Sequence, residues 1–91
     1  MKEFDMKPYE AYFSELEKLF YEKNAHMNIV AYMSDKNIFS DDQYNRVFSD
    51  YVKSLRSYED YIKIFEDNVI IPVCGAGKWT ADFERRVVYI D

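Results

Sequence analysis

Residues 41–66 repeat apolar side chains at the spacing of an α-helix. The apolar positions fall in two neighbouring rows with a seven-residue period, and these rows are Phe48, Leu55 and Ile62, and Tyr44, Tyr51, Tyr58 and Phe65. A helix over this segment spans about 39 Å. A seam with a period of 3.5 residues is typical of a helix that packs lengthwise against another helix. The sequence therefore predicts one long helix over 41–66 with a second helix lying along it.

Both ends of this segment carry signals for helix termini. Ser40, followed three residues later by Gln43, forms a capping box at the start. At the other end, Asn68 tolerates the left-handed conformation that often terminates a helix, and Pro72 lies just beyond it. We therefore expect the helix to begin after Ser40 and to stop near Asp67 and Asn68.

An earlier segment also has helical spacing. It begins near Pro8, which is tolerated in a first turn, and Asp5 is its candidate cap. Two alternatives stay open here: one helix over about 8–34, or a break near Asn24, which is a poor helix residue but has neither Gly nor Pro beside it. A turn over 34–37 makes the two helical segments antiparallel neighbours.

The last quarter of the chain changes from helical spacing to alternation. The β-branched run 69–73, which contains Pro72, predicts an edge strand, and the Gly-Ala-Gly segment 75–77 predicts a turn. Beyond Lys78 apolar and polar residues alternate, and residues 87–90 are apolar on both faces. These patterns predict a β-hairpin whose final segment is buried on both sides.

The predicted fold class is therefore α+β, in a single domain over residues 1–91. Two long antiparallel helices, the first either continuous or broken near Asn24, precede a C-terminal β-hairpin. Because a lone hairpin is marginal in water, we expect it to pack on the helices, to gain a third strand from a partner, or both. The incomplete sheet and the aromatic seam each predict self-association, so we expect a homodimer.

The charge balance argues against several classes of partner. Twelve basic and seventeen acidic side chains give a net charge of -5, and the basic residues gather in no segment. Nucleic acids and anionic membranes both attract clustered Lys and Arg, so neither is an expected partner. No apolar run approaches the roughly 20 residues of a membrane span. The single Cys is typical of a reducing compartment, and we expect a cytoplasmic protein.

Side chains that carry chemistry are few. The segment 74–78, Cys-Gly-Ala-Gly-Lys, resembles a phosphate loop only in part, because Pro72 stands in the place of its first Gly and Trp79 follows its Lys. No pattern places His26, the single His, beside Cys74 as a base for a nucleophile. One His and one Cys do not make a zinc site within one chain. We therefore expect no enzyme activity, no cofactor and no metal.

One short cluster combines basic and aromatic side chains. Trp79, Arg85 and Arg86 lie in the predicted hairpin, where they resemble the wing of a winged-helix protein. Asp82 and Glu84 interleave with them and cancel their charge. A nucleic-acid-binding regulator of this kind is the least favoured of three functions.

The favoured function is a small acidic protein-binding module that occludes its partner, in the manner of inhibitors, immunity proteins, antitoxins or mobile-element anti-defence proteins. Nine tyrosines support it, since Tyr and Trp are enriched at interface hot spots, and acidic charge steers association with a basic surface. The alternative is a homodimeric scaffold or accessory subunit without an inhibitory role. The predicted partner-binding residues are Asp41, Asp42, Tyr51, Tyr58, Glu59, Asp60, Trp79, Arg85 and Arg86.

Overall fold

The computed structural model describes residues 1–36 and 41–91, and for Asp41 it describes the backbone only. The predicted capping residue Ser40 lies outside these residues. The elements in chain order are β1 (Lys2–Asp5), the 3₁₀ turn η1 (Lys7–Tyr9), α1 (Glu10–Lys36), α2 (Asp41–Phe65), the π-helix η2 (Glu66–Cys74), β2 (Trp79–Asp82) and β3 (Val87–Ile90).

Helix α1 is continuous over 27 residues, so the chain does not break at Asn24. The Asp5 side chain accepts a hydrogen bond from the backbone N–H of Lys7 at 2.9 Å. This bond precedes η1, a turn that holds Pro8 where its missing N–H is harmless. Of the two alternatives for the first helical segment, the single long helix is the one found, and the α-helix itself begins at Glu10.

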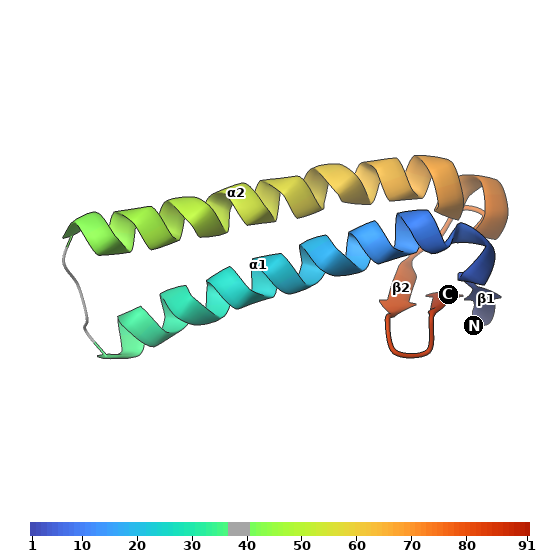
Figure 1. Ribbon diagram of the computed structural model, residues 1–91. Coiled ribbons are helices and arrows are strands. Elements are labelled where there is room, and N and C mark those ends of the chain that lie inside the picture. Colours follow the sequence, from blue (N-terminus) through green and yellow to red (C-terminus); the bar gives the residue numbers. More distant parts are fainter. Residues whose placement is uncertain (37–40) are drawn as a thin grey trace. The chain divides into compact units, whose positions relative to one another are not determined.

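Helices α1 and α2 are antiparallel, as Figure 1 shows. The C-terminal part of the seam predicted on α2 faces α1: the ring of Tyr58 lies 5.8 Å from that of Phe20, and the ring of Phe65 lies 6.2 Å from that of Phe13. Tyr58 is half-buried and Phe65 is fully buried. The lengthwise partner of the aromatic seam is therefore the chain's own first helix.

The edge strand predicted over 69–73 is wrong, because these residues continue the helix as η2. Val69 and Ile70 are buried, so core packing overrides the β preference of branched side chains. Nor does the helix stop at Asn68, whose side-chain amide donates to the carbonyl of Ile64 at 2.7 Å. It ends at Gly75, whose φ is 89° and whose N–H donates to the carbonyl of Ile70.

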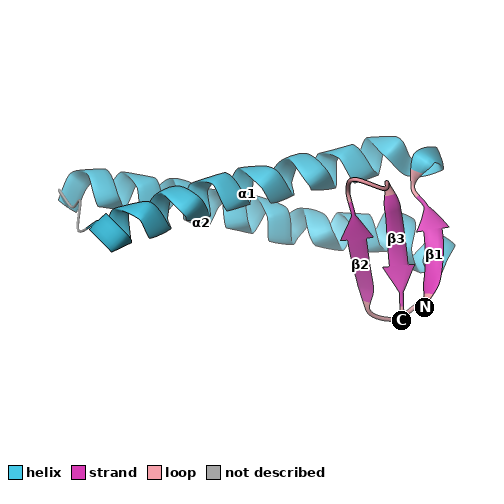
Figure 2. Cartoon of the chain, turned by 90° about the horizontal axis from the view of Figure 1, so that it is seen from below, coloured by secondary structure: helices cyan, strands magenta, loops and turns pink. Residues whose placement is uncertain are grey.

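The C-terminal hairpin exists, but β2 and β3 form it, and the turn lies at residues 83–86 rather than at 75–77. A third strand, β1, pairs antiparallel with the other edge of β3, so the order is β1-β3-β2 (Figure 2). The central position of β3 explains why Val87, Val88 and Ile90 are all buried. The third strand therefore comes from the chain's own N-terminus. Both features from which the sequence predicted a homodimer are satisfied within one chain.

The chain divides into two compact units. Unit 1 comprises Met1–Glu17 and Tyr61–Asp91, and unit 2 comprises Lys18–Asp60. Unit 1 has a dense core in which Phe13 contacts Phe83 at 5.2 Å and Phe65 contacts Trp79 at 5.3 Å. The hairpin thus packs on helix segments of its own unit. Of the ten buried apolar residues in the described part of the chain, nine belong to unit 1.

Candidate protein-binding surface

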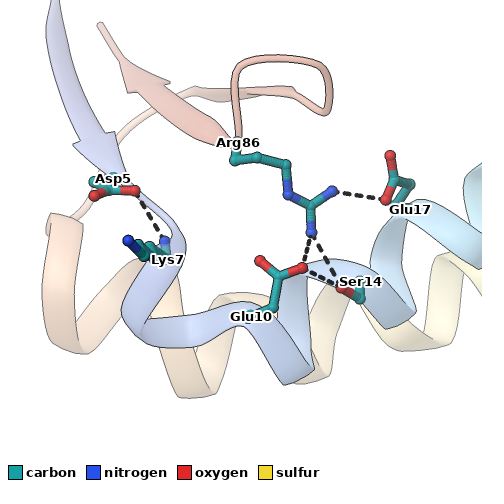
Figure 3. A network of polar contacts seen from close by, with 6 residues as sticks. All are labelled: Asp5, Lys7, Glu10, Ser14, Glu17 and Arg86. Carbon is teal, nitrogen blue, oxygen red and sulfur yellow. Dashed lines mark hydrogen bonds and ion pairs between the residues drawn. The ribbon is translucent and has the colours of Figure 1, made fainter.

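Arg86 links the hairpin turn of unit 1 to the first turns of α1 (Figure 3). Its φ is 58°, in the left-handed region that side chains other than Gly rarely adopt. From this turn its guanidinium donates to Glu17 Oε1 at 2.7 Å, to Ser14 Oγ at 3.0 Å and to Glu10. The guanidinium carbon also lies 4.7 Å from the ring centroid of Phe13. The side chain therefore joins two charges and an aromatic face within one unit.

The electrostatics of this cluster favour its charged forms. The hydrogen bond from Ser14 lowers the pKa of the Glu10 carboxyl, burial opposes that shift, and Arg86 lowers the pKa further. Desolvation by itself lowers the pKa of the Arg86 guanidinium, but hydrogen bonds and charges from Glu17 and Glu10 outweigh it and raise that pKa. The cluster is thus an internal ion-pair network.

The other two members of the basic-aromatic cluster also have contacts inside unit 1. Arg85 pairs with Glu3 at 2.9 Å and donates to the hydroxyl of Tyr89. Trp79 is half-buried and packs against Phe65. These contacts give all three residues a structural role, and their predicted contact with a partner stays a prediction.

The predicted acidic residues lie on α2 but do not form one patch. Asp42 stands in its first turn, whereas Glu59 and Asp60 stand near its end, and the side chains of all three are exposed. Glu59 lies seventeen positions after Asp42, which corresponds to about 26 Å along the helix axis. A single basic side chain of a partner can therefore contact either Asp42 or the pair Glu59 and Asp60, but not both.

The two predicted tyrosines of α2 are half-buried within unit 2. Burial raises the pKa of the Tyr58 hydroxyl. Lys23 of α1 places its ammonium 5.1 Å from the ring centroid of Tyr58, a cation–π contact. The ring of Tyr51 lies 6.3 Å from that of Phe48 in an edge contact, and the ring of Phe48 stacks on that of Tyr44 at 6.0 Å. Both predicted tyrosines therefore contribute to packing in unit 2, and only part of each ring is open to a partner.

The two side chains considered for chemistry have ordinary surroundings. His26 shares a hydrogen bond through Nδ1 with the hydroxyl of Ser54, so it joins α1 to α2 within unit 2. Cys74 is a half-buried free thiol, and burial raises its pKa. A nucleophilic cysteine needs a lowered pKa, so the surroundings of Cys74 suppress the thiolate.

The exposed apolar residues of unit 2 were missed by the sequence reasoning. Tyr21 and Tyr32 lie on the side of α1 away from Lys23 and His26, the residues that contact α2, and the exposed Ile29 lies at the edge of that side. Tyr32 is 58% exposed, and Tyr21 is 53% exposed although its ring edge contacts Phe20. The signal was present in the sequence, since α1 carries apolar side chains on two opposite faces. We call Tyr21, Ala25, Asn28, Ile29 and Tyr32 the outer face of α1.

Charge is divided unequally between the two units. Unit 1 contains ten acidic and six basic side chains, and unit 2 contains seven acidic and six basic ones. The acidic excess of the protein therefore belongs mainly to the unit with the dense core. The unit with the exposed aromatic side chains is close to neutral.

None of the described helices combines the length and the apolar character needed to cross a membrane. Within residues 1–36 and 41–91, no group of three or more His, Cys, Asp or Glu side chains is placed to hold a metal ion. Comparison of the chain with protein-family models, with curated proteins and with solved structures found no match.

Proposed function

We propose that this chain is a non-enzymatic protein-binding module and that unit 2 provides the surface that contacts the partner. One contrast carries the proposal. Among the described residues, unit 2 contains only one of the ten buried apolar side chains but five of the nine large apolar side chains that are exposed. These five are Tyr21, Met27, Ile29, Tyr32 and Phe48.

The composition of this surface is that of an interface. Tyr, Phe and Met are enriched where proteins meet, whereas the charged residues Lys, Glu and Asp are depleted there. Complete burial of a fully exposed apolar side chain contributes about 1.5–3 kcal/mol, and these five side chains, which are 42–58% exposed, would contribute about half of that each. The near-neutral charge of unit 2 fits this mode of binding, in which apolar contact supplies most of the affinity.

The acidic excess of unit 1 supports the more specific proposal that the module occludes a basic partner. An acidic surface accelerates encounter with a basic one, and the effect weakens with salt. We therefore expect electrostatics to set the association rate and the apolar side chains of unit 2 to set the lifetime of the complex. Measured rates at low and high salt test this division: an association rate that is unchanged by salt contradicts occlusion of a basic surface.

Nucleic-acid binding has less support as the function. Arg85 and Arg86, on which that alternative depends, are ion-paired with glutamates of unit 1. The free thiol of Cys74 supports a reducing compartment, and we propose the cytoplasm as the location.

The test uses three tagged baits in lysate of source cells, each with and without nuclease. The baits are the wild type, Tyr21→Ser/Tyr32→Ser, and the matched control Ile64→Ser, which removes an exposed apolar side chain from unit 1. We expect a stoichiometric protein that survives nuclease, is retained by the control and is lost from the double variant. Equal recovery with all three baits contradicts the role of unit 2, and recovery that vanishes with nuclease favours nucleic-acid binding.

A further inference from the structure

We infer that a second copy of this chain covers the outer face of α1, with the two α1 helices paired antiparallel. The inference rests on the proposed function of unit 2 as a protein-binding surface, and it names a second copy, in place of the basic partner of the occlusion proposal, as the protein that covers the outer face of α1. Its basis is the pattern of exposed residues along α1 between Lys18 and Asp35.

Six exposed residues of α1 form a seam with the spacing of a coiled coil. Their separations are three, four, three, four and three residues, which is the alternation of a and d positions in a heptad repeat. All six side chains are exposed in the chain by itself. The seam residues are Lys18, Tyr21, Ala25, Asn28, Tyr32 and Asp35.

The spacing of this seam and the positions of its two tyrosines are symmetric about its centre. Its separations are the same from either end, with the two tyrosines flanking the two smaller residues, Ala25 and Asn28. In an antiparallel pair centred between these two, Tyr21 lies opposite Tyr32 of the second copy. Ala25 lies opposite Asn28 of the second copy. Each pair of facing residues, which we call a layer, therefore combines an a position with a d position. The two-fold axis between the copies makes every layer occur twice.

The outermost layer shows charge complementarity. In the same register Lys18 lies opposite Asp35 of the second copy, and Asp35 lies opposite Lys18 of the second copy. A parallel pair instead places Lys18 against the second Lys18 and Asp35 against the second Asp35, and like charges that face each other are destabilising. The charges thus favour a second copy in the antiparallel direction.

The centre of the seam favours close contact. Ala25 has a small side chain that lets two helices approach closely. Asn28 lies opposite Ala25 of the second copy, where a polar side chain lowers the stability of the pair. The rings of Tyr21 and Tyr32 contribute apolar area while their hydroxyls reach the wet edge of the contact. The seam is short, so we expect association that reverses on dilution.

The experiment measures molar mass by sedimentation equilibrium, from micromolar to near-millimolar protein. It compares the wild type with Lys18→Asp, with Asp35→Lys, and with the double variant that carries both changes. The matched control is Lys53→Asp, an exposed charge reversal on α2 outside the seam. Circular dichroism checks that each variant keeps its helix content.

We expect the wild type and the control to form dimers, and each single reversal to raise the dimer dissociation constant about tenfold, because two attractive pairs become repulsive. The double variant should return to within about threefold of the wild type, since its opposite charges meet again. A parallel dimer responds differently, because a single reversal exchanges one like-charged pair for another and leaves the dissociation constant unchanged.

Three results overturn the inference. They are a dimer that ignores the single reversals, a dimer that the double variant does not restore, and a chain that stays monomeric at every concentration. If the chain is monomeric but the Tyr21→Ser/Tyr32→Ser bait loses a captured protein, the second copy is excluded while the proposed function stands. If the chain is monomeric and that bait also captures the same proteins as the wild type, both fail.

Discussion

Substitution of Arg86 separates two opposing contributions to the stability of unit 1. Its side chain makes two ion pairs and a cation–π contact, which stabilise the folded state. Its backbone has a φ of 58°, which is unfavourable for any residue other than Gly. Alanine removes the first contribution and keeps the strain, whereas glycine removes both.

The magnitudes follow from the exposure of the partners. The Arg86 side chain is 29% exposed, and those of Glu10 and Glu17 are 55% and 28% exposed. The pair with Glu17 contributes up to about 1 kcal/mol, the contact with Phe13 adds about 1 kcal/mol, and the pair with the exposed Glu10 carboxylate adds little. We therefore expect Arg86→Ala to lower the free energy of unfolding by about 2 kcal/mol. Arg86→Gly also relieves the strain of the left-handed backbone, so we expect its free energy of unfolding to be about 1 kcal/mol higher than that of Arg86→Ala.

Urea titration followed by the fluorescence of Trp79 measures these differences. Trp79 is the single tryptophan and contacts the buried Phe65, so its emission reports on unit 1. Arg86→Lys keeps the charge but loses the planar guanidinium that pairs with two groups at once. Its free energy of unfolding should therefore lie between those of the wild type and Arg86→Gly. Equal stability of Arg86→Ala and the wild type refutes the role of the ion pairs. An Arg86→Gly protein that is less stable than Arg86→Ala refutes the argument from backbone strain.

Three further predictions concern burial and titration. Phe65→Ala should lower the free energy of unfolding by about 3–5 kcal/mol because Phe65 is fully buried. Ile71→Ala, at a 60% exposed site of the same unit, should lower it by less than about 1 kcal/mol in the same urea titration. The hydrogen bond from Ser14 and the charge of Arg86 hold the folded pKa of Glu10 below its ordinary value. Its stabilisation is therefore complete above the unfolded pKa and is lost as pH falls through the folded pKa, so acid titration of Glu10→Gln should show a shallower loss of stability than the wild type. Burial raises the pKa of the Cys74 thiol, so iodoacetamide should modify it more slowly in the native protein than in urea at the same pH, and equal rates would contradict this burial.

The helical part of the fold was predictable because burial repeats along the chain. The aromatic seam of α2 predicts the length of that helix and indicates that a second helix packs beside it. Helix α1 is that second helix. The C-terminal residues Val87–Ile90 were predictable for the same reason, since apolar side chains on both faces indicate a central strand.

The errors arose where long-range contacts decide the local conformation. Residues 69–73 have the composition of a strand, but burial of Val69 and Ile70 keeps them helical. The hairpin turn was misplaced because Arg86, and not a glycine, adopts its left-handed position. The strand β1 is four residues long, with only one of them half-buried, so it carries too little alternation to predict.

The candidate site was less predictable than the fold. Arg86 resembled a partner contact because its glutamates lie 69 and 76 positions earlier in the chain. The outer face of α1 could not be predicted from the sequence pattern, for a different reason. A helix with apolar side chains on two faces gives no clear stripe, and only the contacts of the other face with α2 show which side stays exposed.

The most direct test of the account is the accessibility of single tyrosines inside cells. Hydroxyl-radical footprinting, read residue by residue by mass spectrometry, compares intact cells with dilute purified protein. Tyr12, an exposed tyrosine of unit 1, is the internal reference. The account predicts that oxidation of Tyr21 and Tyr32 relative to Tyr12 is several-fold slower in cells, because protein covers the outer face of α1. The same relative rates in cells and in dilute solution would contradict it.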